Sequence, residues 1–202
     1  EDLYLEGKIE AYEDLTKENE SDKYQYLLPS FEISKSFNNN LSLASNGYQK
    51  NYDTNIFEKV LINDLKYSTT PKITSKGFVN KLNILFKNVT TDSENSNEYN
   101  NTFRSQNFGS LLYDISFPMK KEGNNYNNFL SGKASFMYSP NKNKNIKSID
   151  RKINIKNVFS QNRLGLSDSV EGGQSLTLGG EYKITDKQNN SILTAGLASV
   201  LR

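Results

Sequence analysis

Charged side chains and glycines gather in one short stretch near the end of the sequence. Arg163 precedes Asp168 and Glu171, and Gly172 and Gly173 follow directly. A guanidinium pairs with a carboxylate through two parallel hydrogen bonds, and a glycine pair lets the backbone reverse sharply. We interpret the stretch as a charge network that holds a loop in place. The alternative is a polar turn with a flexible glycine pair.

Enzyme chemistry is restricted by what the sequence lacks. The 202 residues include no His and no Cys, which excludes histidine-based triads, thiolate nucleophiles and Cys/His metal sites within this chain. Carboxylate, Lys, Tyr and Ser chemistry stays formally open, but we predict no enzyme and no catalytic, cofactor-binding or metal-binding residue. With 25 basic and 23 acidic residues, charge gives no argument for nucleic-acid binding.

The elements that must position the charged stretch are strands, because apolar residues recur at every second position along most of the chain. The alternation is clearest between Phe78 and Val89. No helix is predicted. Strands are predicted over residues 3–12, 24–35, 41–49, 57–68, 78–89, 110–119, 130–138, 174–184 and 191–201, with one more in the alternation of Ile149, Ile153, Ile155 and Phe159.

Polar segments separate these strands. The longest predicted loop is Thr90 to Ser105, and Asn38 to Asn40 is predicted to turn tightly because Asn tolerates left-handed backbone angles. Pro29 indicates an edge or a bulge in its strand. The basic run from Asn141 to Lys156 is either a loop that meets lipid phosphates or an ordinary solvated loop.

Alternation by itself does not separate a soluble β-sandwich from a membrane barrel. Three features favour the barrel: strands of about ten residues where soluble strands average about five or six, polar faces rich in Ser, Asn, Lys and Glu, and aromatic residues near strand ends. We therefore predict an all-β fold in which residues 1–202 are part of a single outer-membrane domain. The domain would be an antiparallel transmembrane β-barrel, of which roughly ten strands are present. Because both ends read as strand, we expect a fragment. The aromatic residues are Tyr12, Tyr24, Tyr26, Tyr67, Phe78 and Tyr138.

The alternation also assigns side chains to the two faces of the wall. The predicted lipid-facing residues are Leu27, Phe31, Ile33, Leu82, Ile84, Phe86, Leu111, Ile115, Phe117, Leu176 and Leu178. The predicted lumen-facing residues are Glu32, Ser34, Asp114, Ser116, Ser175, Thr177 and Glu181.

The charged stretch also resembles a known family. The run Asn162-Arg163-Leu164-Gly165-Leu166-Ser167-Asp168, with Glu171-Gly172-Gly173 and then Gly179 and Tyr182, is similar to LptD, the lipopolysaccharide-assembly outer-membrane proteins also called organic solvent tolerance proteins, above all the alphaproteobacterial type. Leu28-Pro29-Ser30-Phe31-Glu32 resembles the family's Leu-Pro-x-Phe strand, and Asn63-Asp64-Leu65 and Ser139-Pro140-Asn141 are less specific likenesses. Gly165 stands one position earlier than the family pattern has it.

The resemblance implies a function. Members of this family form a very large barrel that receives lipopolysaccharide from a periplasmic bridge protein. The barrel holds an LptE-like plug lipoprotein and releases lipopolysaccharide into the outer leaflet of the Gram-negative outer membrane through an opening between its first and last strands. The expected partners are therefore lipopolysaccharide, the plug, the bridge and membrane lipids, without nucleic acid and without a cofactor. The chain would be a middle-to-late part of this translocon, without the N-terminal periplasmic domain.

Three other functions remain open from the residues themselves. They are a small passive porin, an enzyme in a small outer-membrane barrel, and a soluble β-sandwich that binds a ligand such as a sugar. A porin of this length would conduct ions as a closed barrel, whereas an arc of a larger barrel would not. A sandwich would be soluble without detergent.

The face assignment makes the first prediction. Leu82→Arg and Ile115→Arg are each expected to cost ~2–4 kcal/mol near the bilayer midplane and to block membrane assembly, whereas Ser116→Ala leaves assembly unchanged. Heat-modifiable mobility of the intact protein in gels measures this. Normal assembly of both arginine variants would contradict the assignment.

Overall fold

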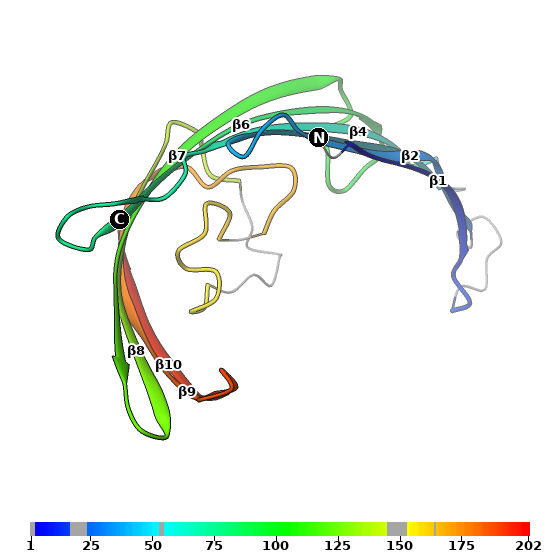
Figure 1. Ribbon diagram of the computed structural model, residues 1–202. Coiled ribbons are helices and arrows are strands. Elements are labelled where there is room, and N and C mark those ends of the chain that lie inside the picture. Colours follow the sequence, from blue (N-terminus) through cyan, green and yellow to red (C-terminus); the bar gives the residue numbers. More distant parts are fainter. Residues whose placement is uncertain (1–2, 17–23, 53–54, 145–152, 164) are drawn as a thin grey trace. The chain divides into compact units, whose positions relative to one another are not determined.

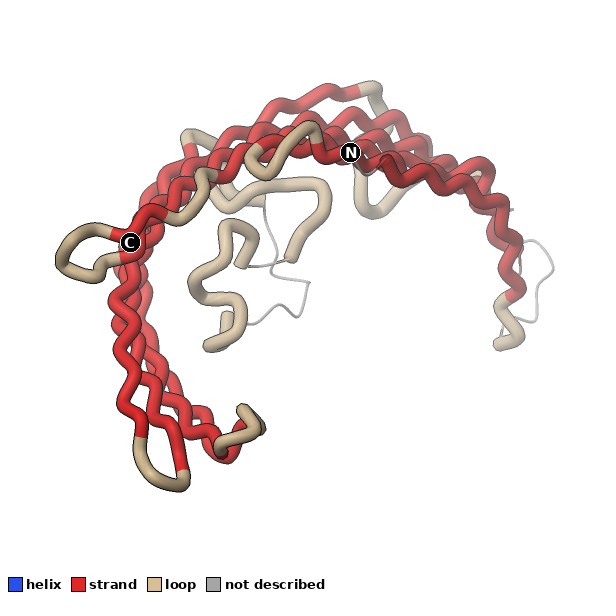
Figure 2. The backbone as a smooth tube through the Cα atoms, in the orientation of Figure 1, coloured by secondary structure: helices blue, strands red, loops and turns tan. Residues whose placement is uncertain are grey.

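The computed structural model describes residues 3–16, 24–52, 55–144, 153–163 and 165–202, and these form strands, turns and loops (Figure 2). No helix in this part of the chain is long and apolar enough to cross a membrane. The strands are β1 (Leu3–Glu13), β2 (Tyr24–Ser36), β3 (Leu41–Tyr52), β4 (Phe57–Ser68), β5 (Lys72–Ile73), β6 (Val79–Glu94), β7 (Arg104–Glu122), β8 (Tyr126–Ser139), β9 (Gly173–Asp186) and β10 (Ser191–Leu201).

These strands belong to one ten-stranded sheet. Its order is β1-β2-β3-β4-β6-β7-β8-β9-β10, with β5 paired to β6, and within the described residues the path ends at β1 and β10 without closing. The strands pair antiparallel in β1–β2, β2–β3, β3–β4, β5–β6, β7–β8, β8–β9 and β9–β10. A sandwich needs two packed sheets. The all-β antiparallel prediction is therefore confirmed.

Several strands extend further than the sequence predicted, above all β6 and β7. The expected loop from Thr90 to Ser105 is shorter, because β6 continues to Glu94 and β7 begins at Arg104. Apolar alternation stops near Val89, yet backbone pairing does not need apolar side chains. Ser93, which is buried, donates a hydrogen bond of 2.8 Å to the carbonyl of Asn100 in the remaining loop.

The strand expected in the basic run is wrong for residues 153–159, which form turns, and Ile149 lies outside the described residues. The Asn157 side chain accepts a hydrogen bond of 2.8 Å from the backbone N–H of Asn154, and the backbone N–H of Val158 donates to the carbonyl of Asn154 at 2.9 Å. Local side-chain acceptors of this kind compete with strand pairing. Most of the basic run, residues 145–152, is likewise outside the described residues.

Pro29 lies at a bulge, one of the two situations predicted for it. The register of β2 with β3 shifts between Leu27 and Ser30, and the register with β1 shifts between Lys8 and Glu10. Proline donates no hydrogen bond, so an irregular position accommodates it without the loss of a ladder bond.

The turn between β2 and β3 forms at the predicted place by another means. Asn38 Oδ1 accepts hydrogen bonds of 2.8 Å from the backbone N–H groups of Asn40 and Leu41. Among the described residues, the asparagines with positive φ lie elsewhere, at Asn55, Asn95 and Asn189. The turn therefore depends on the acceptor oxygen of Asn38 and not on a left-handed backbone.

The chain divides into two compact units. Unit 1 contains residues 1–67 and 85–108, and unit 2 contains residues 68–84 and 109–202. On one face of unit 1, Val60, Ile62 and Val89 form a small buried cluster, against which Tyr48, Tyr99 and Phe108 pack. We call this side the polar face of unit 1, because most of the other side chains on it are polar or charged.

An ion pair lies on the polar face of unit 1. Lys87 Nζ of β6 is 2.6 Å from Asp64 Oδ1 of β4, and the two side chains are only 5% and 16% exposed. Lys66 stands 3.9 Å from the same carboxylate but is 55% exposed. Breaking the Lys87 pair is therefore expected to cost far more free energy than breaking the Lys66 pair.

Removal of one partner tests this ion pair. Asp64→Ala removes the Asp64 carboxylate from the buried Lys87 ammonium. We therefore expect the free energy of unfolding of the intact protein in detergent to fall by ~3–5 kcal/mol. The double variant Asp64→Ala/Lys87→Met should recover most of this loss. Lys66→Met is the matched control, with an expected change of about 0–1 kcal/mol. Urea titration measures all three, and equal loss in the single and the double variant would contradict the assignment.

Candidate functional site

The segment between β8 and β9, which we call the loop of residues 140–172, lies over one face of unit 2 in its described parts, residues 140–144, 153–163 and 165–172 (Figure 1). Gln161 Nε2 donates to Ser110 of β7, at 2.8 Å to its Oγ and 3.1 Å to its backbone carbonyl. Lys133 Nζ of β8 lies 5.8 Å from the centre of the Phe159 ring. We call this side the covered face of unit 2 and the other side its apolar face.

A buried ion pair fastens the loop. Arg163 Nε donates to Glu171 Oε2 at 2.9 Å and Nη2 donates to Oε1 at 2.7 Å, and the two side chains are 2% and 3% exposed. The same guanidinium donates to Ser175 Oγ at 2.9 Å and to Thr177 Oγ1 at 3.3 Å. Both hydroxyls belong to β9, so the Arg163 side chain joins the middle of the loop and its β9 end to the sheet.

Asp168 takes a different partner from the one expected. The expected charge network joins Arg163 to both Asp168 and Glu171, but the carboxylate of Asp168 lies 2.5 Å from Lys144 Nζ. Glu171 has a second cation near it, the half-exposed guanidinium of Arg202. The network thus consists of a buried Arg163–Glu171 pair and a separate Lys144–Asp168 pair.

The two glycines that follow Glu171 meet different requirements. A Cβ at Gly172 would lie 2.0 Å from the carbonyl oxygen of Asn141, so only glycine allows this close approach. Gly173 has a φ of 92°, in the region that favours glycine. The end of the loop therefore depends on both positions, one for space and one for backbone conformation.

Asn162 shapes the turn that presents Arg163. Its Nδ2 donates to the Leu166 carbonyl at 2.8 Å and its Oδ1 accepts from the Leu166 N–H at 3.2 Å. Gly165 has a φ of 63°, which the turn requires. Leu164 lies outside the described residues.

Gly179 and Tyr182, the remaining residues of the sequence motif, lie away from the ion pair. A Cβ at Gly179 would be 2.4 Å from the Leu197 carbonyl, so Gly179 allows β9 to approach β10 closely. Tyr182 lies on the apolar face, where its Oη donates to Asn128 Oδ1 at 2.7 Å. The motif therefore combines loop fastening with positions that serve the sheet itself.

The residues predicted to face a lumen lie on the polar face of unit 1 or the covered face of unit 2, and four of them make polar contacts. In unit 2, Ser175 and Thr177 are buried at Arg163, and Asp114 accepts from Asn83 Nδ2 at 3.0 Å and from the Ser135 hydroxyl. Two more lie on the same side of their strands: Glu181, whose carboxylate is 3.3 Å from Lys133 Nζ, and Ser116, which is opposite Lys133 in the ladder. Glu32 and Ser34 lie on the polar face of unit 1, opposite Glu6 and Tyr4 of β1.

Apart from Leu27, the residues predicted to face lipid lie on the other side of the strands. Phe31 of unit 1 packs against Gly47, where a Cβ would meet its ring at 2.8 Å. The side chain of Leu27 is not among those that the structure describes. The exposed members are Phe31, Ile84, Phe86, Leu176 and Leu178, and the half-buried members are Ile33, Leu82, Leu111, Ile115 and Phe117.

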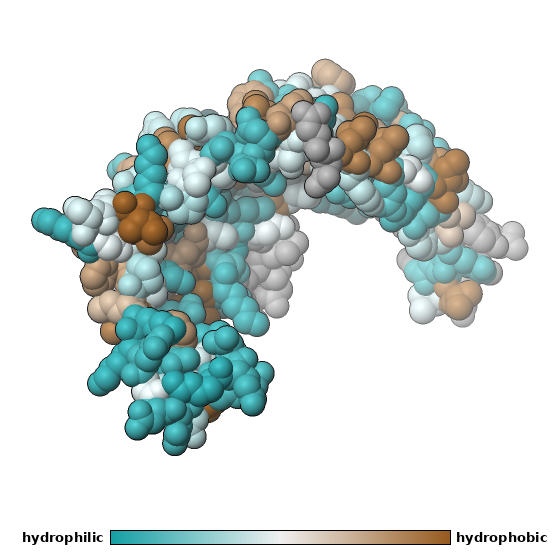
Figure 3. Space-filling model, viewed as in Figure 1, coloured by the Kyte–Doolittle hydropathy of each residue, from teal (hydrophilic) through white to brown (hydrophobic). Residues whose placement is uncertain are grey.

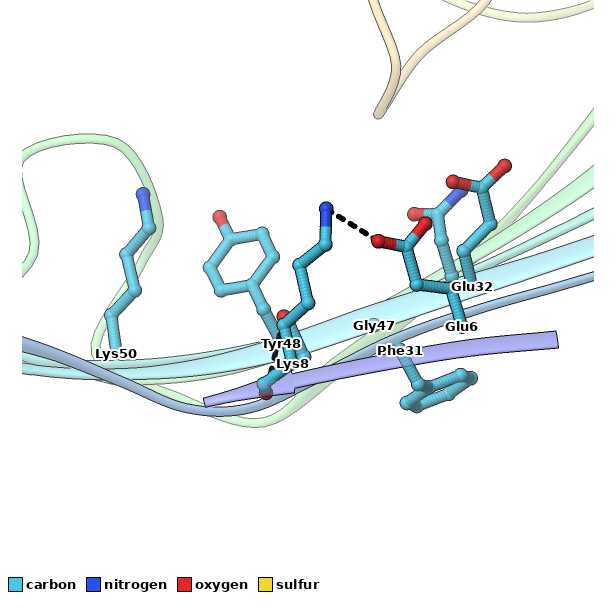
Figure 4. A pocket seen from close by; sticks show the side chains of 9 residues that line it. Glu6, Lys8, Phe31, Glu32, Gly47, Tyr48 and Lys50 are labelled. Carbon is cyan, nitrogen blue, oxygen red and sulfur yellow. Dashed lines mark hydrogen bonds and ion pairs between the residues drawn. The ribbon is translucent and has the colours of Figure 1, made fainter. Parts of the chain in front are cut away.

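Sequence reasoning did not identify a charged pocket on the polar face of unit 1. The pocket of about 390 Å³ is lined mainly by β1, β2 and β3. Figure 4 shows Glu6, Lys8, Glu32 and Tyr48 on one side of the strands and Phe31 on the other. Lys8 pairs with Glu6 at 2.6 Å. The sequence did place Glu6 and Lys8 on the polar side of a predicted strand. Only the pairing of β1 with β2 and of β2 with β3 brings them to Glu32 and Tyr48.

A second feature missed from the sequence is a row of amides and hydroxyls on the other face of unit 1. Ser45 Oγ donates to Asn63 Oδ1 at 2.7 Å, Asn63 Nδ2 donates to Asn88 Oδ1 at 3.5 Å, and Asn88 Nδ2 donates to Asn107 Oδ1 at 2.8 Å. These side chains come from β3, β4, β6 and β7. Only the pairing of these strands aligns them.

Comparison with protein families decides what this architecture belongs to. A family model described as LptD, LPS transport system D, matches residues 85–202, more than half of the chain. This region includes the loop fastened by Arg163. The chain belongs to the LptD family. No curated protein matches it. Membership assigns the chain to lipopolysaccharide transport, and LptD proteins are a transport family and not an enzyme family.

Loss of the Arg163 guanidinium should release the loop from the sheet. The chain has no cysteine, so Ser110→Cys introduces a single thiol beneath Gln161. In this background we expect Arg163→Met to raise the rate of maleimide labelling roughly hundredfold. Loss of a buried partner costs ~3–5 kcal/mol, and the half-exposed Arg202 that stays beside Glu171 offsets only part of this cost.

Two variants control for the loss of positive charge. Arg104→Met removes an exposed guanidinium from β7 and should leave labelling unchanged. Arg202→Met should have a small effect, because the Arg202 side chain is 53% exposed and Glu171 keeps Arg163. Equal labelling of the Arg163→Met and Arg104→Met proteins would show that the ion pair does not hold the loop.

Proposed function

We propose that this LptD-family chain forms part of the wall of an outer-membrane barrel that inserts lipopolysaccharide into the outer leaflet. The polar face of unit 1 and the covered face of unit 2 line the lumen, and the opposite faces contact lipid. The mechanism is non-covalent. Both units belong to a single barrel domain, which the continuous strand order supports.

The observation that carries the proposal is the distribution of exposed apolar side chains. In β8 and β9 of unit 2 they alternate on the side away from the loop, where they form a continuous apolar surface. In water such a surface is costly, whereas in a bilayer it is the favoured exterior of a barrel. The residues are Leu130, Phe136, Tyr138, Leu176, Leu178 and Tyr182.

The polar faces suit the passage of a carbohydrate-rich lipid. The pocket in unit 1 offers carboxylates at Glu6 and Glu32 and an aromatic ring at Tyr48, over which Lys50 Nζ lies at 4.8 Å. Hydroxyls, amides and carboxylates exchange hydrogen bonds with sugar hydroxyls and with water at little net cost. A wall of this chemistry lets a hydrated saccharide move without binding it tightly.

The fastened loop narrows the space on the covered face. Short turns of outer-membrane barrels face the periplasm and longer loops face the outside. On this rule the loop of residues 140–172 enters the lumen from the external side, and Arg163 keeps it against the wall. The loop leaves the other part of the lumen for an LptE-like plug, and a periplasmic bridge protein supplies the lipopolysaccharide.

Photo-cross-linking in cells tests the lumen assignment. A photoreactive phenylalanine analogue in place of Tyr48, on the polar face, should form lipopolysaccharide adducts that disappear when lipopolysaccharide supply is stopped. The matched position Tyr67 is exposed on the opposite face near the turn end of β4, and it should give adducts with phospholipid only. Lipopolysaccharide adducts at Tyr67, or none at Tyr48 in an assembled barrel, would contradict the assignment.

A further inference from the structure

A pocket of about 420 Å³ lies on the apolar face of unit 2, close to its short turns. The ladder places Met119, Leu130 and Tyr182 opposite one another on β7, β8 and β9, so they form one apolar row. One step towards the turns, Lys121 stands opposite Asn128. Apolar groups therefore adjoin a polar pair within a single concave site.

Two polar side chains of this pocket, Asn128 and Lys121, have hydrogen-bond donors that no acceptor among the described residues occupies. Tyr182 Oη donates to Asn128 Oδ1 at 2.7 Å, which occupies the amide oxygen and leaves the Nδ2 hydrogens available. Within the described part of the chain, Lys121 makes no ion pair or hydrogen bond, whereas its neighbour Lys120 pairs with Glu122 at 2.6 Å. A free ammonium and a free amide N–H together favour an anion with several acceptor oxygens.

The surroundings place this donor pair at a boundary between apolar and polar surface. Figure 3 shows hydrophilic side chains gathered at the end of unit 2 that carries the turns 123–125 and 187–190. The apolar row is followed by a lysine and an amide. A phospholipid has matching chemistry along its length, because its acyl chains adjoin a phosphate group. The apolar row also continues into the exposed apolar surface of β8 and β9.

We propose that this pocket binds an anionic glycerophospholipid of the membrane leaflet on the turn side. Lys121 Nζ and Asn128 Nδ2 hold the phosphate oxygens, and Met119, Leu130 and the Tyr182 ring contact the glycerol and the first acyl carbons. The Tyr182 hydroxyl positions the amide of Asn128. The assignment rests on the proposed placement of the apolar face in the bilayer.

Lipid retention on the intact protein tests the site. The protein is purified in mild detergent, incubated with equal amounts of phosphatidylglycerol and phosphatidylcholine, and examined by native mass spectrometry. We expect phosphatidylglycerol to be retained preferentially, and Lys121→Met to reduce its retention about fivefold. Lys121→Met/Asn128→Leu should reduce it further, and Lys121→Arg should keep it.

Lys76→Met is the matched control, because Lys76 is exposed in the turn between β5 and β6 and lies outside the pocket. Equal retention in the Lys76→Met and Lys121→Met proteins would overturn the proposal, as would equal retention of the two lipids by the unaltered protein. Displacement of phosphatidylglycerol by equimolar lipopolysaccharide would assign the site to lipid A phosphates instead. Cross-linking at Tyr48 separates this result from the proposed function, since the lumen assignment stands or falls independently of Lys121.

Discussion

The antiparallel backbone ladder is the constraint on which the rest of this structure depends. Each strand satisfies its N–H and C=O groups through its neighbours, and successive side chains must then point to opposite faces. Two adjacent residues such as Thr177 and Leu178 therefore have opposite environments, one buried at Arg163 and the other exposed. A sheet of this kind is stable where water meets one face and hydrocarbon the other, which is the setting of the LptD family to which the chain belongs.

Two buried ion pairs lie on the polar side of the sheet, each within its own unit. Arg163 with Glu171 in unit 2, and Lys87 with Asp64 in unit 1, lie on the polar sides of their units. Desolvation makes such pairs weak sources of net stability, but a buried charge without its partner is costly. The pairs therefore act mainly on specificity: they select one position for the loop and one pairing of β4 with β6.

The faces proposed to contact lipid are not uniformly apolar, because each also carries a group of polar side chains. The amide row from Ser45 to Asn107 crosses the face of unit 1, and beyond it towards the loops stand polar residues such as Thr90 and Asp92. The pocket of Lys121 and Asn128 adds a donor pair near the turns of unit 2. With the proposed placement of these faces in a bilayer, both features lie where hydrocarbon gives way to head groups, and the second is the proposed lipid site.

The sequence by itself determined the fold class, most strand positions and the family, because period-two alternation and the Glu171-Gly172-Gly173 stretch are local properties of the chain. It also brought Arg163 and Glu171 together as partners within one loop. It did not determine that Lys144 takes Asp168, that β6 runs on to Glu94 through polar residues, or that residues 153–159 turn instead of pairing. The sequence also could not predict the pocket around Glu6 or the amide row from Ser45 to Asn107. The extension of β6, the pocket and the amide row depend on register between strands, which is fixed by backbone pairing across the sheet and which no single segment encodes. The turns at residues 153–159 and the Lys144–Asp168 pair depend instead on contacts made within the loop.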